Sequence, residues 1–326
     1  MILVCGGAGY IGSHMCRLLR QKGIPHVALD NLERGHEEAL PGTPLLRADL
    51  RDPAALESIF AEHAFTTVMH FAAYIEVGES TKNPAGFWEN NVHAVWNLLE
   101  AMRRHGLNQF VFSSTAAVYG EPERVPIPED HPKNPTSPYG NTKLTVERML
   151  GDYSDTYGLR SVCLRYFNAC GSDPDGILGE AHDPETHLIP RVLLAAAGRG
   201  EVKVFGEDYN TPDGTCIRDY VHVCDLADAH LLAIRHLEGG GATDQYNLGS
   251  GTGFSVRQVI DAAKEVTGID FPIGTAPRRA GDPARLIADS TKARTELGWN
   301  PLYTDVRTCV QHAWDWMLSH PNGYKS

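Results

Sequence analysis

The sequence predicts an α/β fold in which a doubly wound parallel sheet is followed by a second, smaller mixed α/β lobe. In the first 170 residues short apolar runs alternate with helical patterns, which requires right-handed crossovers and a parallel sheet covered on both faces. After Asn168 this alternation gives way to a loop at 171–187 that is rich in Gly, Pro and Asp. The chain has 326 residues, more than the roughly 100 to 200 of a typical domain, so two lobes are expected.

The elements follow from these patterns in order along the chain. Strands are expected at the runs MILVC, HVALD, PLLRADL, TTVMHFAA, NQFVFSS and SVCLRYFN. Helices are expected at about 11–22, 53–62 and 84–105, and around Tyr139. In the second lobe, at 171–326, helices are expected near 188–197, 255–266, 291–297 and 305–318. The segment 217–240 is expected to form a short strand and a helix that return to pack on the first lobe.

The composition argues against several classes of partner. With 29 basic and 41 acidic residues, the chain has a formal net charge of −12, whereas binding to nucleic acid needs a broad basic surface. No apolar run reaches transmembrane length, and the amino terminus lacks a signal-peptide pattern, so we expect a cytoplasmic protein with no membrane partner. The seven cysteines include no CxxC pair, so reduced structural thiols are expected rather than disulfides or zinc ligands.

A glycine-rich turn joins the first expected strand to the first expected helix. Gly6, Gly9 and Gly12 stand where backbone N–H groups and a helix dipole bind a pyrophosphate. Asp30 ends the second strand, at the spacing where a carboxylate accepts hydrogen bonds from an adenosine ribose and repels a 2′-phosphate. The sequence therefore favours NAD over NADP. Asp49, at the end of the third strand, either meets the adenine edge or is simply solvated or capping.

Tyr139 and Lys143 form the most informative pair in the chain. Ser137 is a plausible N-cap and Pro138 fits the first helical position, so Tyr139 and Lys143 are expected one turn apart on one helix face. A cation at roughly 5 Å lowers the pKa of a phenol by about two units at an effective dielectric of about 20. We therefore expect Lys143 to favour the phenolate. The spacing alone is common enough to arise by chance.

Hydroxyl groups are expected close to this pair. Ser113, Ser114 and Thr115 lie at the carboxyl end of the fifth strand, where open parallel sheets bind their ligands. A hydroxyl there can reach the same substrate atom as Tyr139.

Together, GGAGYIG, Asp30, SSTAAVYG and the YxxxK spacing of Tyr139 and Lys143 resemble the extended short-chain dehydrogenase/reductase family. Further motifs are similar, in the same order over nearly the whole chain, to the UDP-sugar 4-epimerases of that family. These motifs are DNL (30–32), HFAA (70–73), VGES (77–80), SPYG (137–140), RYFNACG (165–171), DGTCIRDYVHVCDLADAH (213–230), YNLGSG (246–251) and APRRAGD (276–282).

The resemblance implies a reaction that inverts C4 of a UDP-sugar without net oxidation. Tyr139 would remove the proton of the 4-hydroxyl and later return it, while hydride passes from C4 to bound NAD and back to the opposite face of a 4-keto sugar. UDP-galactose and UDP-glucose would interconvert. Lys143 would lower the pKa of Tyr139 and contact the nicotinamide ribose, and Thr115 would orient the reacting hydroxyl.

The resemblance also implies the binding residues and the organisation of the protein. Residues 1–170 would form an NAD-binding Rossmann domain, with 217–240 returning to it, and 171–326 a UDP-sugar-binding lobe. A homodimer would form through the helices around 84–105 and 138–157. The implied cofactor-binding residues are Gly6, Gly9, Tyr10, Ile11, Gly12, Asp30, Asn31, Asp49, Leu50, Phe71, Ala72, Ala73, Asn90, Ser113, Tyr139, Lys143 and Tyr166.

On the substrate side, Arg218 and Arg279 would hold the phosphates, because arginine is suited to bidentate phosphate contacts. Asp282 would bind the uridine ribose and Phe205 the uracil. The implied substrate-binding residues are Thr115, Tyr139, Asn168, Leu188, Phe205, Arg218, Arg279 and Asp282.

Several positions depart from related patterns. Ala116 and Ala117 replace the acidic residues that dehydrating and decarboxylating relatives use, so the chemistry should stop at C4. Ile75 and His187 stand where some members carry a lysine and an asparagine, and those contacts are not transferred. Leu286 replaces a bulky tyrosine and leaves more space, which suggests that UDP-GlcNAc and UDP-GalNAc are also accepted.

Three alternatives stay open on sequence grounds. The protein could epimerise another UDP-sugar, such as a uronate or a pentose, or it could be a non-catalytic NAD-sensing protein that keeps the fold. His182 and His187 have a spacing that a metal could use. Because the sequence shows no evident acidic or cysteine partner set, we expect an exposed loop and no metal site there.

Overall fold

The computed structural model, which describes residues 1–279 and 282–324, contains a seven-stranded parallel sheet, and the predicted fold class is confirmed. The sheet order is β11-β6-β5-β4-β1-β2-β3. In that order the strands are β11 (Asp244–Leu248), β6 (Arg160–Tyr166), β5 (Gln109–Thr115), β4 (Thr67–His70), β1 (Ile2–Cys5), β2 (His26–Asp30) and β3 (Leu45–Arg47). Because all seven strands are parallel, their carboxyl ends meet at one edge of the sheet.

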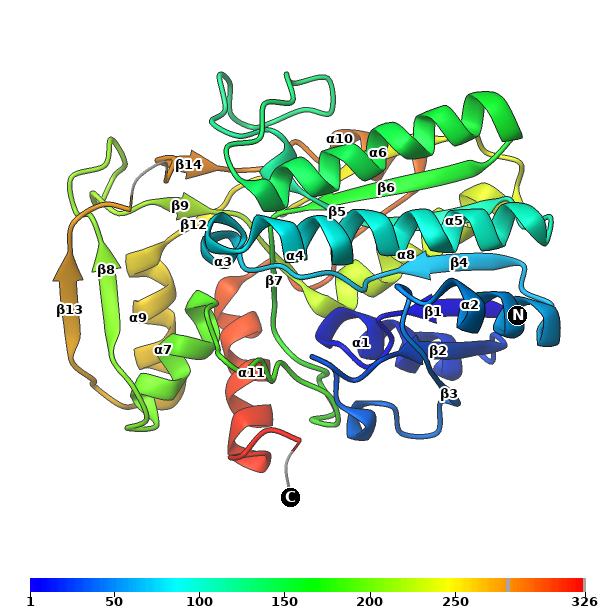
Figure 1. The fold of residues 1–326 in the computed structure, drawn as a ribbon. Helices are drawn as coiled ribbons and strands as arrows, with labels where there is room; N and C mark the ends of the chain where they lie inside the picture. The colour runs from blue at the N-terminus through cyan, green and yellow to red at the C-terminus, as the bar shows by residue number, and fades with distance from the viewer. Residues whose placement is uncertain (280–281, 325–326) are drawn as a thin grey trace.

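Helices cover both faces of this sheet (Figure 1). One face packs against α1 (Tyr10–Gln21) and α8 (Val223–Glu238), with α10 (Thr291–Glu296) beside them. The other face packs against α2 (Pro53–Glu62), α5 (Ala94–Arg104) and α6 (Pro138–Tyr157). Apolar side chains of the strands are buried between these layers, and this burial is the main favourable term in folding.

The second lobe forms a separate core from the later part of the chain. The helices α7 (Leu188–Ala196), α9 (Val256–Thr267) and α11 (Val306–Ser319) pack together there. Small sheets border this core. They are β8 (Val202–Phe205) with β13 (Ile273–Ala276), β7 (Asn168–Cys170) with β10 (Tyr220–His222), and β9 (Ile217–Arg218) between β12 (Phe254–Ser255) and β14 (Arg285–Leu286).

Short helical segments complete the fold. They are η1 (Glu37–Ala39), α3 (Val77–Lys82), α4 (Pro84–Trp88), η2 (Glu89–His93) and η3 (Ala116–Val118). The single helix expected at 84–105 is therefore built from α4, the π-helical η2 and α5.

Local sequence signals set the ends of several helices. Asp52 caps α2, accepting hydrogen bonds from Ala54 and Ala55 N–H, and Ser255 with Gln258 forms a capping box at α9. Such caps satisfy N–H groups that have no partner inside the helix.

The boundary between the lobes differs from the expected division at residue 170. Within the segment 217–240, α8 runs back to the first lobe and packs on α1 and on strands β5 and β6, whereas β9 and β10 pair in the small sheets that border the second core. Strand β11, which the sequence analysis placed in the second lobe, pairs with β6 and forms the edge of the large sheet. Two elements from the later part of the chain, α8 and β11, therefore complete the first lobe. Among the described residues, no helix has the length and apolar character needed to cross a membrane.

Candidate active site

The glycine turn brings the start of α1 close to the carboxyl ends of β1 and β4. Gly6 has a φ of +74°, and a Cβ there would lie 2.5 Å from the backbone nitrogen of Ala72. A Cβ on Gly12 would lie 2.1 Å from the Gly6 carbonyl oxygen. At Gly9 the closest such contact is 3.4 Å, so the space beside it is more open. Side chains at Gly6 and Gly12 would therefore push α1 away from the turn. Because both residues are glycine, the helix stays close, and its first N–H groups remain available to an anionic group.

Two predicted cofactor residues in this region have side chains with other partners. The Tyr10 hydroxyl donates to the Gly171 carbonyl oxygen at 2.6 Å, so only its backbone faces the turn. The Asn31 amide donates to Asp49 Oδ2 at 2.9 Å. Ile11 lies in the first turn of α1.

Asp30 ties the glycine turn to the end of β2. Its carboxylate accepts hydrogen bonds from Ala8 N at 3.0 Å and Leu32 N at 2.9 Å, and the residue is only 8% exposed. Burial raises the pKa of Asp30, and the hydrogen bonds from Leu32 and Ala8 act in the opposite direction. The carboxylate is thus held in place at the position predicted for a ribose.

Asp49 lies two residues beyond the end of β3, not in the strand. Arg51 contacts both of its oxygens, with Nη2 donating at 2.6 Å. Hydrogen bonds from Arg51 hold its pKa well below its usual range. The Asp49 carboxylate thus lies in a local ion pair with Arg51, which neither earlier interpretation included, and its contact with an adenine stays a prediction. The neighbouring Leu50 is buried in the core.

Tyr139 lies in the first turn of α6, where Ser137 caps the helix by accepting from Gly140 N at 3.1 Å. The residue is 9% exposed. Burial raises its pKa to about 12, and a hydrogen bond with the Thr115 side chain only partly offsets this. The first turn of α6 packs closely on η3, since a Cβ on Gly140 would lie 2.6 Å from the Ala117 carbonyl oxygen, so Tyr139 and Thr115 lie on neighbouring elements. The net pKa of Tyr139 is raised and not lowered, because burial dominates.

Lys143 lies one turn further along α6, and its ammonium is directed at β5. Its Nζ donates to the Ser113 carbonyl oxygen at 2.8 Å and lies 4.8 Å from the centre of the Phe112 ring. The residue is 3% exposed, and burial lowers its pKa to about 7. Because the ammonium points at the backbone of β5, it gives less support to a Tyr139 phenolate than the helix spacing suggested.

Side chains at the ends of β5 and β6 surround this pair. The Ser113 and Tyr166 hydroxyls are hydrogen-bonded to each other. Thr115 Oγ1 accepts from Ala117 N at 3.2 Å and so caps η3. Ala116 and Ala117 lie in η3 and add no ionisable group there.

The segment after β4 borders the glycine turn and is fixed by a residue that the sequence analysis missed. Asn91 is 2% exposed; it accepts from Tyr74 N at 2.8 Å and donates to the Tyr74 carbonyl oxygen at 2.9 Å. The predicted Asn90 donates to Asn91 at 3.1 Å. Two successive asparagines in the expected helix at 84–105 were the signal available for this contact. The predicted residues Phe71, Ala72 and Ala73 lie in this segment.

The predicted nucleotide side of the substrate site is assembled from β8, β9 and the loop before β14. Arg218 forms an ion pair with Asp282, and the guanidinium carbon of Arg279 lies 3.9 Å from the centre of the Phe205 ring. Ala280 and Gly281 of the same motif lie outside the described residues. The four predicted residues therefore form two contacting pairs, and an arginine supplies the positive charge in each pair.

The other predicted substrate residues lie at the junction of the lobes. Asn168, in β7, donates to the Asp219 carbonyl oxygen at 2.7 Å, and Leu188 is the first residue of α7. Asp219 was not predicted. It is fully buried, and its carboxylate accepts from Ser250 N at 2.7 Å and Ala288 N at 3.0 Å. The only sequence signal for a role of Asp219 was its position directly after Arg218.

The three positions that depart from the family pattern lie in different surroundings. Ile75 precedes Glu76, whose charge acts on Tyr139 and raises its pKa slightly. Leu286, in β14, packs against the buried cluster that contains Tyr119 and Leu144. His187 precedes α7 and contacts acidic side chains.

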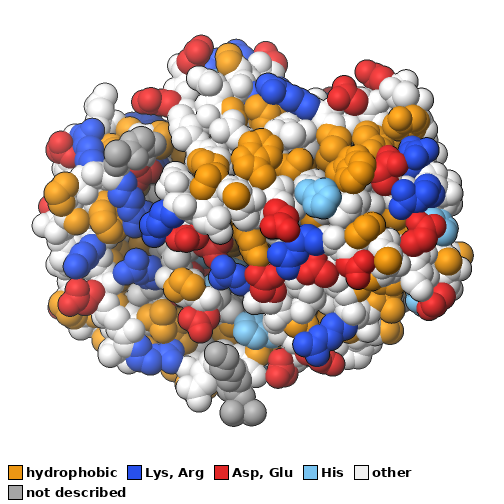
Figure 2. Space-filling model, viewed as in Figure 1, with side chains coloured by type: hydrophobic (Ala, Val, Ile, Leu, Met, Phe, Trp, Pro, Cys, Tyr) orange, Lys and Arg blue, Asp and Glu red, His pale blue; other side chains and the backbone are white. Residues whose placement is uncertain are grey.

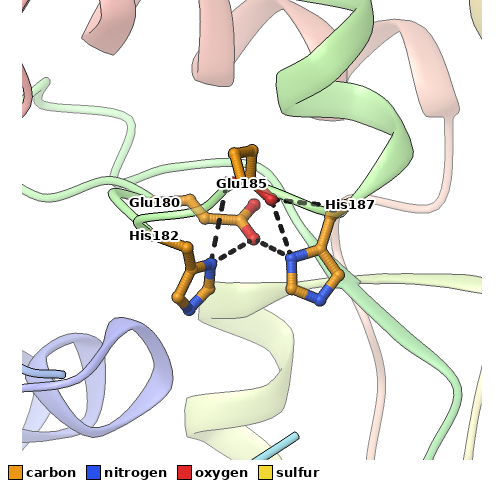
Figure 3. Close-up of side chains that lie close together, drawn as sticks. All are labelled: Glu180, His182, Glu185 and His187. Carbon is orange, nitrogen blue, oxygen red and sulfur yellow. Dashed lines mark hydrogen bonds and ion pairs between the residues drawn. The ribbon is translucent and has the colours of Figure 1, made fainter. Parts of the chain in front are cut away.

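These contacts correct the interpretation of the histidine loop. Glu180 and Glu185 lie between His182 and His187, and their side chains are only 7% and 10% exposed (Figure 3). Burial alone would lower the pKa values of both histidines, but the carboxylates raise them to about 9 for His182 and about 10 for His187. The expected exposed loop without acidic partners is therefore wrong.

A parallel sheet with a glycine turn and a buried Tyr-Lys-Thr set defines a class of nucleotide-cofactor enzymes. The family described as NAD dependent epimerase/dehydratase matches residues 2–249, and the chain belongs to it.

Several similar proteins carry the same name, UDP-glucose 4-epimerase. The chain is 53% identical over 326 residues to UDP-glucose 4-epimerase of Halalkalibacterium halodurans, covering 100% of this chain and 98% of that protein. A crystal structure of UDP-glucose 4-epimerase superposes with a TM-score of 0.97 at 51% identity, covering 100% of this chain and 99% of the other. The enzyme from Brucella ovis in complex with NAD superposes with a TM-score of 0.94 at 48% identity, covering 96% and 97%.

Proposed function

We propose that this protein interconverts UDP-galactose and UDP-glucose by inverting C4 of the sugar, with NAD held in the first lobe. The observation that carries this is the packing of the first turns of α6, which carry Tyr139 and Lys143, against the end of β5, which carries Thr115: Lys143 Nζ donates to the Ser113 carbonyl oxygen at 2.8 Å, at the sheet edge that also holds the glycine turn and Asp30. The full-length identity of about half to enzymes of this name supports the same activity.

The first lobe supplies a site that fits NAD. The close approach at Gly6 and Gly12 leaves room for a pyrophosphate at the start of α1, and Asp30 is positioned for the adenosine ribose. Its negative charge disfavours a 2′-phosphate. When bound, NAD accepts a hydride from the sugar and returns it. The lobe that holds it would consist of residues 1–170 together with α8 and β11.

Tyr139 and Thr115 would move the proton. Thr115, at the end of β5, would orient a sugar hydroxyl between itself and the phenol. Because burial raises the pKa of Tyr139 to about 12, the phenolate that abstracts the 4-hydroxyl proton needs additional positive charge nearby. Lys143 supplies part of this charge, and an oxidised nicotinamide carries more. The protonated Tyr139 would then return the proton to the same oxygen after inversion.

The second lobe would hold the UDP group. Arg218 and Arg279 are cationic groups suited to a diphosphate, and Asp282 and Phe205 lie in contact with them. A substrate anchored by its nucleotide can turn its sugar ring while it stays bound. Ala116 and Ala117 offer no acid or base for a further elimination or decarboxylation, so the products would remain hexose isomers.

The range of sugars is a separate question. Leu286 lies beside Tyr119 and Leu144 and is smaller than a tyrosine at that position, so we propose that N-acetylated UDP-hexoses are accepted as well. A UDP-uronate or UDP-pentose is the alternative, because the Tyr-Lys-Thr set does not contact C6.

Two further proposals concern assembly and compartment. Trp88 and Trp96 are 40% and 47% exposed on α4 and α5, and Figure 2 shows hydrophobic side chains gathered on the face formed by α5 and α6. This surface supports a homodimer through these helices. All seven cysteines lie within the described residues and are free, which supports a cytoplasmic location.

The test is to incubate the purified protein with UDP-galactose, adding no cofactor, and to follow the anomeric proton signals by NMR. Appearance of UDP-glucose at a constant final ratio supports the proposal and shows that NAD is carried through purification. Failure of conversion even after NAD is added would reject the hexose assignment. Parallel incubations with UDP-GalNAc and a UDP-uronate separate the alternatives.

A further inference from the structure

The loop before α7 brings four potential metal ligands together. His182 Nδ1 lies 3.0 Å from Glu180 Oε1 and 3.6 Å from Glu185 Oε2. His187 Nδ1 lies 2.8 Å from Glu180 Oε1 and 3.1 Å from Glu185 Oε1. One ligand atom from each of the four residues lies within 4.8 Å of all the others, and Figure 3 shows both rings turned toward both carboxylates.

These spacings match the edges of a tetrahedral site. With metal–ligand bonds of about 2.0–2.2 Å, neighbouring ligands of a tetrahedral zinc ion lie about 3.3–3.6 Å apart. Of the four nitrogen–oxygen distances in the cluster, three, at 2.8–3.1 Å, lie below this range and one, at 3.6 Å, lies at its upper end, so the side chains must move apart by a few tenths of an ångström to admit an ion. We propose that Glu180, His182, Glu185 and His187 bind one structural Zn²⁺ ion.

The donor set fits zinc in type and in charge. Two imidazole nitrogens and two carboxylate oxygens are ligands that Zn²⁺ accepts, and the two negative charges balance the charge of the ion. The protein fills all four positions of a tetrahedron. A closed site of this kind has no position for a substrate or a reactive water, so its role is structural.

The surrounding contacts hold the ligands in this arrangement. Glu185 Oε1 accepts hydrogen bonds from Thr186 N and His187 N, both at 2.7 Å, which fixes its carboxylate. The loop that carries Glu180 and His182 is tied down on both sides of Glu180. His36 Nε2 lies 2.9 Å from the Ala181 carbonyl oxygen, and the Tyr324 hydroxyl lies 3.0 Å from Gly179 N. Such outer contacts orient metal ligands and contribute to affinity.

The cluster lies between the glycine turn and the start of α7, so an ion bound there would affect both. The ring of Tyr10, at the start of α1 in the glycine turn, lies 6.2 Å from the ring of His182 in an edge-on arrangement. On the other side, His187 directly precedes Leu188, the first residue of α7. An ion bound here would connect the cofactor-side turn to the first helix of the second lobe, and removing it would loosen both.

The same four groups could instead be held by protons, as two histidinium–carboxylate pairs. Zinc content and stability distinguish the two states. The full chain, prepared without an affinity tag, is dialysed against a strong chelator and then titrated with ZnCl₂ or with MgCl₂ as a control. Zinc content is measured by elemental analysis and the melting temperature by thermal denaturation.

We expect one Zn²⁺ per chain and a melting temperature that rises with zinc but not with magnesium, because a ligand that binds only the folded state stabilises it. His182→Gln and His187→Gln should each weaken zinc binding by at least about tenfold. The matched control is His105→Gln, which removes another histidine paired with a glutamate, Glu57, at 2.8 Å, and it should bind zinc as the unaltered chain does.

A chelator-treated protein that takes up less than about a tenth of an equivalent of zinc and shows no change in melting temperature would overturn the proposal. Equal zinc binding by the His182→Gln and His105→Gln variants would overturn it too. If the ligand variants fail to fold, Co²⁺ added to the unaltered chain decides. A tetrahedral site gives strong visible absorption that Zn²⁺ displaces, and weak octahedral absorption contradicts the proposed geometry.

Discussion

At the scale of single residues, the candidate site places ionisable groups where burial opposes their charged forms. Tyr139 and Lys143 are almost completely buried, and burial shifts the pKa of each toward its neutral form. A buried lysine destabilises a fold unless an anion or a polar contact offsets the loss of water. Residues kept at such a cost are expected to serve function and not stability.

Replacing Tyr139 by phenylalanine should abolish the proton transfer and leave the fold intact. We expect the rate of UDP-galactose conversion to fall about 10²- to 10⁴-fold, the usual contribution of a general acid–base group. The control is Tyr157→Phe, at the exposed end of the same helix, which should keep full activity. Undiminished conversion by the Tyr139→Phe variant would favour a non-catalytic role.

Replacing Lys143 by methionine should abolish activity and raise stability. The pKa of Lys143 falls from its ordinary 10.5 to about 7 in the folded chain. Between these values the unfolded chain binds a proton that the folded chain largely lacks, so the stability of the unaltered protein rises with pH across this window. Below pH 7 both states are protonated and the cost of burying the ammonium remains in full.

Methionine carries no charge, so the melting temperature of Lys143→Met should exceed that of the unaltered chain most clearly at pH 6–7. The difference should shrink as the pH approaches 10. Thermal denaturation of both proteins over this range measures it, and effects of other titrating groups cancel in the difference. A difference that does not change with pH would show that the ammonium is not buried.

Arg279 should contribute to substrate binding more than to the chemical step. A charge-assisted hydrogen bond is worth about 1.5–3 kcal/mol, so Arg279→Ala should raise KM for UDP-galactose roughly tenfold or more with little change in kcat. Arg278→Ala is a close control, because Arg278 stacks on Tyr209 at 4.1 Å much as Arg279 stacks on Phe205 at 3.9 Å. Equal KM values for the two variants would remove Arg279 from the site.

At the scale of elements, the start of α6 connects a helix signal to the chemistry. Ser137 caps this helix and Tyr139 lies in its first turn, so loss of the cap should disturb the phenol. Asp52 provides a similar cap for α2, which carries none of the predicted catalytic residues.

We expect Ser137→Ala and Asp52→Ala each to lower the free energy of unfolding by about 1 kcal/mol. Only Ser137→Ala should lower kcat, by several-fold. Urea denaturation and steady-state kinetics measure the two effects. A fall in kcat for both variants would mean that activity follows overall stability and not the geometry of α6.

The sequence was sufficient for elements whose signals are local. The glycine turn, the cap at Ser137 and the alternation of strands and helices depend on neighbouring residues, and the structure contains each of them. The edge strand β11 is short and partly polar, and its place depends on pairing with β6, a distant segment. The π-helical η2 contains Asn91, whose partner Tyr74 lies 17 residues away.

In the candidate site, too, features set by neighbouring residues were predicted, and features set by distant contacts were not. Residue types and spacing predicted the strand end that carries Thr115 and the helix start that carries Tyr139, because both signals are local. They could not predict the direction of the pKa shift, which depends on how deeply the phenol is buried. Nor could they show that Glu180 and Glu185 meet His182 and His187, since this depends on the path of a loop.

At the scale of the whole molecule, the two lobes are linked by several crossings of the chain. Helix α8 and strand β11 return to the first lobe after the second has begun, so neither lobe is a continuous stretch. The predicted catalytic set and the predicted nucleotide-binding arginines lie on different lobes. Relative placement of the lobes is therefore expected to determine activity, and contacts that fix it, such as those of Asn168 with Asp219, are expected to affect kcat as well as stability.

The proposed dimer is also a property of the whole molecule. We expect the protein to elute with twice the mass of the chain by light scattering, and Trp96→Glu to shift it to a monomer because a charge would be buried at the interface. Leu302→Glu changes another exposed apolar side chain, 69% exposed and outside this face, and should leave the dimer intact. A monomer in the unaltered protein would contradict the assembly.

The central claim is that C4 of the sugar is oxidised and re-reduced by one NAD that stays bound. The most direct test uses UDP-galactose carrying deuterium at C4, with the protein as purified and no added cofactor. The account predicts UDP-glucose with the deuterium retained at C4, because the same hydride leaves and returns. Loss of the deuterium from C4, either to solvent or into NADH released to solution with the sugar left as a 4-keto product, would contradict it.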